Sequence, residues 1–342
     1  MEATHARTVG ETKPSGPRPR RVLRYTISFL LLLIVAGGLT FYTEPLWVND
    51  QMIRYKLRRQ HVDSTYVQVD GYSIHYFEAH PPQGPGRPLI LIHGIGSRGE
   101  DWAPMIAPLA AQGFHVYVPD LLGYGRSPQP DVDYSISLEQ TTVQNFMDAL
   151  HIQKADVGGW SMGGWIALRM ALDHPDRVNR LVVYDAAGIY FPPTFDASLF
   201  VPSDAAGLAT LRHILSPINN PFPAFVSRSA VQRLQHNAWV IERSFYAMEN
   251  GRDLMDFRLN SIRVPTLIVW GSVDQLIPLA VGQRMRDAIP NSSLVTITGC
   301  GHLAPSECPV PVLKATTEFL KSDQPPTPHE FAIDGTVAPP IR

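Results

Sequence analysis

The sequence predicts an α/β protein with a mostly parallel sheet that is covered by helices on both faces. Short, continuous apolar runs suited to fully buried strands recur at 89–92, 181–184 and 266–270. Helical segments alternate with these runs, which is the pattern of a parallel sheet with crossover helices. The 342 residues, 44% of them hydrophobic, are enough for one large core that carries an insertion.

The N-terminal segment is predicted to be a membrane anchor. Residues 25–42 carry no charge, and a helix of this length is about 27 Å long, close to the roughly 30 Å of a bilayer core. Four arginines precede it and aromatic residues flank it: Arg18, Arg20, Arg21 and Arg24, with Tyr25, Phe41, Tyr42 and Trp47. The positive charges predict a single pass with a cytoplasmic N-terminus and the rest of the chain on the far side. A cleaved, secretory signal peptide is the alternative, with 36–38 as its small-residue cleavage site.

The domain limits follow from these patterns. We expect a basic tail at 1–24, a transmembrane helix at 25–43 and a juxtamembrane linker at 44–64. In the linker, Leu46, Ile53 and Leu57 share one face of a short amphipathic helix that would lie on the membrane surface. The globular domain is expected at 65–322, and the polar, Pro-rich residues 323–342 are expected to be a disordered tail.

The elements of the globular domain can be placed in order. Alternating runs at 65–69 and 73–79 around Asp70-Gly71 predict a β-hairpin. Further strands are expected at 89–92, 114–118, 155–158, 181–184, 266–270 and 294–297, which gives an eight-stranded sheet. Helices are expected at 137–150, with Ser137 as its cap, and at 162–173. Residues 188–257 contain no clear buried strand and are predicted to form a helical cap, with helices at 208–215 and 230–246.

The most specific motif is Gly159-Trp160-Ser161-Met162-Gly163, which lies between a predicted strand and a predicted helix. This is the G-x-S-x-G pattern, in which a nucleophilic serine occupies a very tight turn. Side chains at the two glycines would collide with the neighbouring strand and helix. The pattern predicts that Ser161 is a nucleophile.

A nucleophilic serine needs a base and a carboxylate that orients the base. Asp274 follows the strand at 266–270, and His302 follows the strand at 294–297. The chain order Ser161, Asp274, His302 is the order expected for this arrangement, and each residue lies past the carboxyl end of a strand. Asp185, which also ends a predicted strand, is the competing candidate for the acid.

An oxyanion hole can also be placed. Residues His93-Gly94-Ile95-Gly96 follow the strand at 89–92, and Met162 opens the helix after the serine. We expect the backbone N–H groups of Ile95 and Met162 to stabilise the oxyanion. His93 is expected to be structural and to hold its own loop.

With these motifs, the chain resembles the α/β-hydrolase fold family with a helical cap. The resemblance runs from about Tyr66 to Leu320 and includes His93-Gly94, 119–127, 159–164, 270–274 and 301–302. The anchor ahead of the domain is similar to membrane-anchored, monoacylglycerol-lipase-like serine hydrolases. The resemblance implies that 120–127 is a structural loop. It also implies that Ser161 hydrolyses an ester through an acyl-enzyme, without metal or cofactor.

Composition narrows the range of functions. A net charge of −2 gives no argument for nucleic-acid binding, and no Cys/His cluster in the sequence has metal-ligand spacing. The two cysteines, Cys300 and Cys308, are either small buried thiols or a single disulfide. The apolar cap and the anchor favour an acylglycerol or another lipid-like ester as substrate. Cleavage of a C–C bond or an amide, and a non-catalytic ligand-binding role, are the alternatives. The sequence does not predict an oligomeric state.

Overall fold

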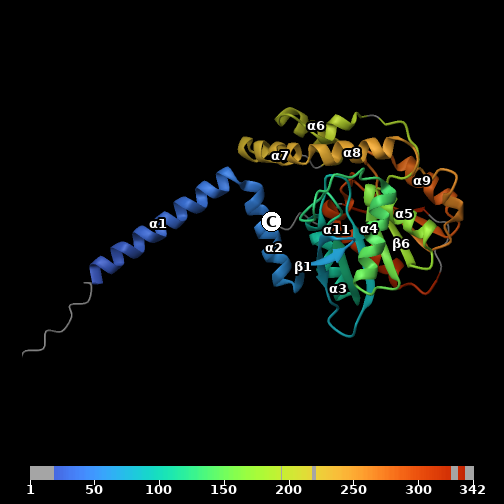
Figure 1. Ribbon diagram of the computed structural model, residues 1–342, viewed down its shortest axis with the longest axis horizontal. Coiled ribbons are helices and arrows are strands. Elements are labelled where there is room, and N and C mark those ends of the chain that lie inside the picture. The colour runs from blue at the N-terminus through green and yellow to red at the C-terminus, as the bar shows by residue number, and fades with distance from the viewer. Residues whose placement is uncertain (1–18, 194, 218–220, 325–329, 336–342) are drawn as a thin grey trace, which may run out of the picture.

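The computed structural model describes residues 19–193, 195–217, 221–324 and 330–335. Most of the predicted basic tail, residues 1–18, lies outside the described residues, as do 325–329 and 336–342 of the predicted C-terminal tail. In the described part, an apolar helix projects from a globular α/β domain, and a layer of cap helices lies across one end of that domain (Figure 1).

The described strands form one nine-stranded sheet in the order β1-β2-β4-β3-β5-β6-β7-β8-β9. They are β1 (Val62–Val69), β2 (Tyr72–Ala79), β3 (Arg87–Ile92), β4 (Phe114–Pro119), β5 (Ala155–Trp160), β6 (Val178–Tyr184), β7 (Thr266–Gly271), β8 (Ser292–Thr298) and β9 (Glu330–Asp334). Strand β2 pairs antiparallel with both β1 and β4, and the other pairs are parallel. The predicted α/β-hydrolase fold with a mostly parallel sheet is therefore confirmed.

Helices cover both faces of this sheet and bury two apolar cores. One face packs against α4 (Ile136–Ala149), α5 (Met162–Asp173) and α9 (Leu279–Ala288). The other packs against η1 (Gly99–Trp102), α3 (Ala103–Ala111), α10 (Ala304–Glu307) and α11 (Pro309–Lys321). Because both faces are covered, strands such as β7 are buried at every position, which explains their continuous apolar sequence.

The predicted β-hairpin is present, and the helix predicted after it on the chain has a different cap. Asp70 and Gly71, which connect β1 and β2, have φ values of 50° and 84°, as a tight hairpin turn requires. The helix predicted at 137–150 is α4, but its cap is Ser135, not Ser137. The Ser135 Oγ accepts a hydrogen bond from the Leu138 N–H, whereas Ser137 lies inside the helix and bonds Asp253.

The predicted cap is helical in the described residues, with one correction. It contains η2 (Ala197–Phe200), α6 (Ala205–Leu215), α7 (Ala224–His236) and α8 (Ala238–Glu249), and η3 (Leu259–Ser261) follows it. The single helix expected at 230–246 is two helices that meet at Asn237. The side-chain oxygen of Asn237 accepts a hydrogen bond from Gln129, which ties this break to the loop below it.

The C-terminal tail differs from the expectation of disorder from residue 323 onwards. Helix α11 ends at Lys321, and Glu330–Asp334 then form β9, a ninth strand parallel to β8. Five residues with a weak apolar pattern gave no strand signal by themselves. The exposed edge of β8 provides the backbone partners that make this segment a strand.

The N-terminal helix α1 (Pro19–Thr43) contains the predicted span. Its segment Val22–Thr43 is apolar and long enough to cross a membrane, and none of it is buried against the rest of the protein. The helix extends away from the globular domain (Figure 1). Its last turn contacts the cap. The ring centres of Phe41 and Tyr42 lie 5.6 and 5.3 Å, respectively, from the ring centre of Phe225 on α7.

The segment expected to lie on the membrane surface is helix α2 (Pro45–Arg59), and it packs on the globular domain instead. Leu57 is 1% exposed and belongs to the core on the α3 side of the sheet, where Ile53 also packs. Asp50 pairs with Arg98 and Arg233, and Arg54 pairs with Glu100. The face that the sequence assigned to lipid is therefore largely an internal packing face.

Candidate active site

The tight turn between β5 and α5 places Ser161 at one end of the sheet. Ser161 has φ 57° and ψ −119°, a strained conformation for a residue other than glycine. A Cβ on Gly159 would lie 2.1 Å from the Gly163 carbonyl oxygen, and one on Gly163 would lie 2.3 Å from the Ile92 carbonyl oxygen. The two glycines are therefore required for the close approach of strand and helix, as the motif predicts.

The structure brings the three predicted catalytic side chains together. The Nε2 atom of His302 lies 3.0 Å from the Oγ of Ser161, and its Nδ1 lies 2.8 Å from Oδ2 of Asp274. All three residues are buried. The other carboxylate oxygen of Asp274 accepts the backbone N–H groups of Leu276 and Ile277 at 2.8 and 3.0 Å, which fixes the carboxylate in place.

The competing acid, Asp185, has a different partner. Its Oδ1 accepts a hydrogen bond from the Gly271 N–H at 2.7 Å, at the base of the loop that carries Asp274. Burial, together with the nearby Asp274 charge, raises the pKa of Asp185 well above its usual value. A raised pKa makes a carboxyl group less suited to stabilise an imidazolium. Since Nδ1 of His302 contacts Asp274, the geometry also favours Asp274 as the acid.

Three contacts hold the loop of His302, and the two hydrogen bonds among them were not predicted from the sequence. The indole N–H of Trp160 donates to the His302 carbonyl at 2.7 Å, and the His302 N–H donates to the Leu215 carbonyl at the end of α6. Cys300 and Cys308 form a disulfide across this loop, which decides between the two alternatives left open above. The loop is therefore tied to the nucleophile strand and to the cap.

The predicted oxyanion donors flank the serine. Ile95 and Met162 line the same cavity as Ser161, and Met162 is the first residue of α5, where backbone N–H groups lack acceptors within the helix. His93 is buried, and its ring joins two loops: Nδ1 lies 2.8 Å from the Gly94 oxygen, and Nε2 accepts the Leu121 N–H at 3.0 Å. Burial lowers the pKa of His93.

The loop at 120–127 has the structural form that the resemblance implies. The buried Asp120 accepts hydrogen bonds from the N–H groups of Gly99 and Arg126 and contacts Nδ1 of His75 at 2.7 Å. Burial by itself would raise the pKa of Asp120, but His75, His93 and the Gly99 N–H hold it below its usual value.

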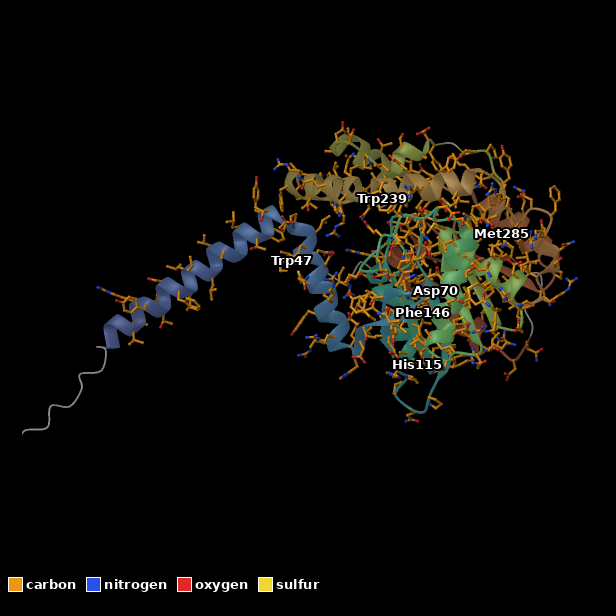
Figure 2. All side chains as sticks on the ribbon, in the orientation of Figure 1. Trp47, Asp70, His115, Phe146, Trp239 and Met285 are labelled. Atoms are coloured by element: carbon orange, nitrogen blue, oxygen red, sulfur yellow. A yellow bond between two sulfur atoms is a disulfide. The ribbon has the colours of Figure 1, made fainter. Side chains whose placement is uncertain are left out.

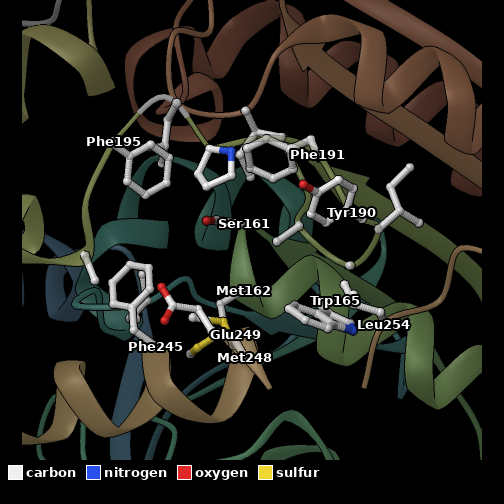
Figure 3. Close-up of a pocket in the computed structure, with 18 of the residues that line it drawn as sticks. Ser161, Met162, Trp165, Tyr190, Phe191, Phe195, Phe245, Met248, Glu249 and Leu254 are labelled. Atoms are coloured by element: carbon white, nitrogen blue, oxygen red, sulfur yellow. The ribbon is translucent and has the colours of Figure 1, made fainter. Parts of the chain in front are cut away.

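An apolar cavity of about 240 Å³ opens beside Ser161 beneath the cap. The rings of Phe191, Phe195 and Phe245 surround the serine hydroxyl (Figure 3). Among the described residues that line the cavity, Glu249 on α8 carries the only charge. These cap residues were missed because their pattern in the sequence is indistinguishable from ordinary core packing.

A second, smaller cavity of about 90 Å³ also borders Ser161. It is lined by Ser161, His302 and Trp160, and by leucines of the cap at positions 211, 215 and 234. The larger cavity does not include His302 among its described lining residues. Ser161 thus borders both a large apolar cavity and a small one that has the imidazole of His302 in its lining.

Comparisons with known proteins agree with this fold. Residues 87–308 match the family model of the alpha/beta hydrolase fold. The 2-hydroxymuconate semialdehyde hydrolase of Pseudomonas sp. strain CF600 is 32% identical over 64% of this chain and 81% of its own. The 2-hydroxy-6-oxo-6-(2'-aminophenyl)hexa-2,4-dienoic acid hydrolase of Metapseudomonas resinovorans is 28% identical over 75% and 90%, respectively.

A solved structure extends the similarity to most of the chain. The crystal structure of a membrane phospholipase A, described as a bacterial virulence factor, has a TM-score of 0.73 at 28% identity. The match covers 87% of this chain and 97% of that one.

Proposed function

Because this chain belongs to the α/β-hydrolase fold family, we propose that it is a membrane-anchored serine hydrolase that cleaves lipid-like carboxylic esters, such as acylglycerols. The observation that carries the proposal is the hydrogen-bonded series Asp274–His302–Ser161, which ends at an apolar cavity. The membrane phospholipase A, with its similarity to this chain, supports a lipid ester as the substrate class.

The proposed mechanism uses protein groups at each step. Ser161 attacks the ester carbonyl while Nε2 of His302 takes the hydroxyl proton across 3.0 Å. Asp274 holds the Nδ1–H and stabilises the imidazolium, and the N–H groups of Ile95 and Met162 stabilise the oxyanion. His302 then returns the proton to the leaving alcohol. Water, activated by the same imidazole, hydrolyses the acyl-enzyme and restores Ser161.

The two cavities support one orientation of the ester. The leaving alcohol receives its proton from His302, so it occupies the small cavity that includes the imidazole. The acyl chain then occupies the large apolar cavity beneath the cap. In this arrangement the activity depends on the length of an apolar acyl chain more than on the size of the alcohol.

Hydrolysis of a C–C bond in an unsaturated keto acid is the second candidate, because the similar proteins include a 2-hydroxymuconate semialdehyde hydrolase and a hydrolase of a hexa-2,4-dienoic acid. A substrate of that class carries a carboxylate, which a cationic side chain in the cavity would stabilise. The described lining of the large cavity offers Glu249 instead, an exposed residue at the end of α8 whose negative charge repels a carboxylate. The cavity therefore favours a neutral acyl ester.

A fluorophosphonate probe and a series of esters test the proposal. The parent protein should be labelled and should hydrolyse p-nitrophenyl esters, with kcat/KM rising from acetate towards longer acyl chains. Ser161→Ala should lose labelling and about four orders of magnitude or more of activity. Retention of activity within tenfold of the parent would remove Ser161 as the nucleophile. Faster turnover of a dienoic acid than of any ester would favour the second candidate.

Glu249 gives a sharper test of the cavity. Glu249→Gln should raise kcat/KM by up to about tenfold for an ester whose acyl chain ends in a carboxylate, because one like charge is removed. The uncharged ester of the same length should be unaffected. Glu242→Gln, an exposed change on the same helix, serves as the matched control. An equal effect of both changes would show that Glu249 does not face the substrate.

We also propose that α1 anchors the protein with its globular domain on the non-cytoplasmic side. The arginines before the span support this orientation, and the Cys300–Cys308 disulfide suits an oxidising compartment. Cell fractionation and N-terminal sequencing test the proposal. A soluble protein that lacks about 38 N-terminal residues would instead identify the segment as a cleaved signal peptide.

A further inference from the structure

Two histidines and a glutamate gather at one end of strands β2 and β4, on the side of the sheet away from the candidate active site. Glu78 lies near the end of β2, His80 follows that strand, and His115 is the second residue of β4. The predicted catalytic side chains lie past the carboxyl ends of the parallel strands, whereas the cluster lies at the amino end of β4. Figure 2 shows His115 at the lower end of the domain, far from Trp239 on the cap helix α8.

The antiparallel register of β2 and β4 brings these three side chains together. Glu78 pairs with Tyr117 and Ala79 with Val116, so one further step along the ladder places His80 opposite His115. Their rings are 4.1 Å apart. Glu78 and His80 are two residues apart and therefore lie on the same face of the strand.

The contact atoms of the cluster are those that bind metal ions. Oε1 of Glu78 lies 2.8 Å from Nε2 of His115 and 3.5 Å from Nε2 of His80. The ligand atoms of all three residues lie within 4.8 Å of one another. In a tetrahedral zinc site with bonds of about 2.0–2.1 Å, neighbouring ligand atoms are roughly 3.3 Å apart. The two measured separations lie on either side of this value.

We propose that Glu78, His80 and His115 bind a zinc-type divalent transition-metal ion, with a water molecule as the fourth ligand. Imidazole and carboxylate are ligands that Zn²⁺ accepts, and Mg²⁺ selects oxygen ligands instead. The side chains of Glu78 and His115 are largely covered, at 18% and 14% exposed. The side chain of His80 is 59% exposed and is free to turn towards the ion.

A contact outside the cluster supports the same ligand atoms. The hydroxyl group of Tyr117 lies 3.0 Å from Nδ1 of His115, on the side of the ring away from Glu78. A metal-binding histidine commonly donates its second ring N–H to such an oxygen, which leaves the lone pair of Nε2 for the ion.

The site takes no part in the proposed ester hydrolysis, because it lies at the opposite end of the strands from Ser161. The Pro- and Gly-rich loop to β3 starts directly after His80, so the ion would tie the start of this loop to β4. Glu78 and His115 are 37 residues apart in the chain. The unfolded chain does not hold these ligands together, so binding stabilises the folded state.

Thermal unfolding tests the proposal. The sample is the full-length protein without a histidine tag, treated with chelator and kept in detergent. Saturating Zn²⁺ should raise its Tm by about 5 °C, and Mg²⁺ should not. His80→Ala and His115→Gln should abolish the rise, whereas His213→Ala, an exposed histidine on α6, should keep it. Hydrolysis of a soluble ester should be unchanged in each variant, which separates this proposal from the proposed function.

The response of His80→Ala to Zn²⁺ is the result that could overturn the proposed metal site. His80 is exposed, so His80→Ala is expected to fold and to remain informative even where His115→Gln does not. A Tm that is insensitive to Zn²⁺, or a rise of the same size in His80→Ala, would show that the cluster is only a hydrogen-bonded group. Calorimetric titration with Zn²⁺ should give one site per chain in the parent and none in His80→Ala.

Discussion

Replacing Asp50 by asparagine tests whether α2 is part of the globular domain. The carboxylate of Asp50 is 7% exposed and accepts hydrogen bonds from Arg98 at 2.5 and 3.0 Å. Arg233 on the cap helix α7 donates to the same two oxygens at 3.3 and 2.9 Å. One buried aspartate thus joins helix α2 to the loop that follows the predicted oxyanion segment and to the cap.

The expected loss follows from the exposure of the three groups. Breaking a fully buried ion pair costs about 3–5 kcal/mol, and an exposed pair contributes about 0–1 kcal/mol. The side chains of Arg98 and Arg233 are 21% and 34% exposed, which places this cluster between the two limits. We expect Asp50→Asn to lower the free energy of unfolding by about 2 kcal/mol at pH 7, and the Tm by about 5 °C.

The pH dependence has a defined sign. Burial alone would raise the pKa of Asp50, but the hydrogen bonds and charges of Arg98 and Arg233 outweigh it, so the net pKa is below its usual value. The stabilisation is therefore fully present above the unfolded-state pKa of about 3.9 and is lost as the pH falls through the lower folded-state pKa. The difference in Tm between parent and variant should shrink at the most acidic pH at which the protein remains folded.

The assay is thermal unfolding of the full-length protein in detergent, followed by tryptophan fluorescence. Glu44→Gln is the matched control, because it removes one negative charge at the start of the same helix from an exposed side chain that makes no capping hydrogen bond. If Asp50→Asn and Glu44→Gln both unfold within 1 °C of the parent, α2 is not held by this cluster and the reasoning is refuted.

Three further predictions concern the acid, a buried glutamate and the anchor. Asp274→Asn should reduce kcat by up to about 10⁴, because Asp274 contacts Nδ1 of His302. Asp185→Asn should have a much smaller effect, because its carboxylate bonds the Gly271 N–H instead. Steady-state kinetics of a soluble ester would reverse the assignment if Asp185→Asn were the more damaging. Burial raises the pKa of Glu139 to about 8, so parent stability falls as the pH rises from about 4.5 to 8. Glu139→Gln should then have a Tm several degrees above that of the parent at pH 8 and no such gain near pH 4.5. Thermal unfolding curves of parent and variant that coincide at both pH values would contradict this prediction. Deleting residues 1–43 should give a soluble protein that keeps its turnover of a water-soluble ester but loses activity on membrane-borne lipid. Both substrates are assayed in parallel, and loss of both activities would show that α1 contributes to the site itself.

Local patterns in the sequence were sufficient for the fold and for the candidate site residues. Buried strands need continuous apolar runs, and a serine in a tight strand-to-helix turn needs glycine two residues before and after it. These requirements act over a few residues, so they can be recognised without the tertiary structure. The structure then places Ser161, Asp274 and His302 within hydrogen-bond distance, although their catalytic roles stay a prediction.

Other features were decided only by contacts between distant segments. The amphipathic pattern of α2 suits a membrane surface as well as a protein core, and the choice depends on its partners. Those partners are Arg98, Glu100 and Arg233, far along the chain. Strand β9 exists because the edge of β8 is open, and the glutamate–histidine cluster exists because β2 and β4 pair antiparallel. Sequence patterns report which face of an element is apolar, but only the folded chain determines what that face meets.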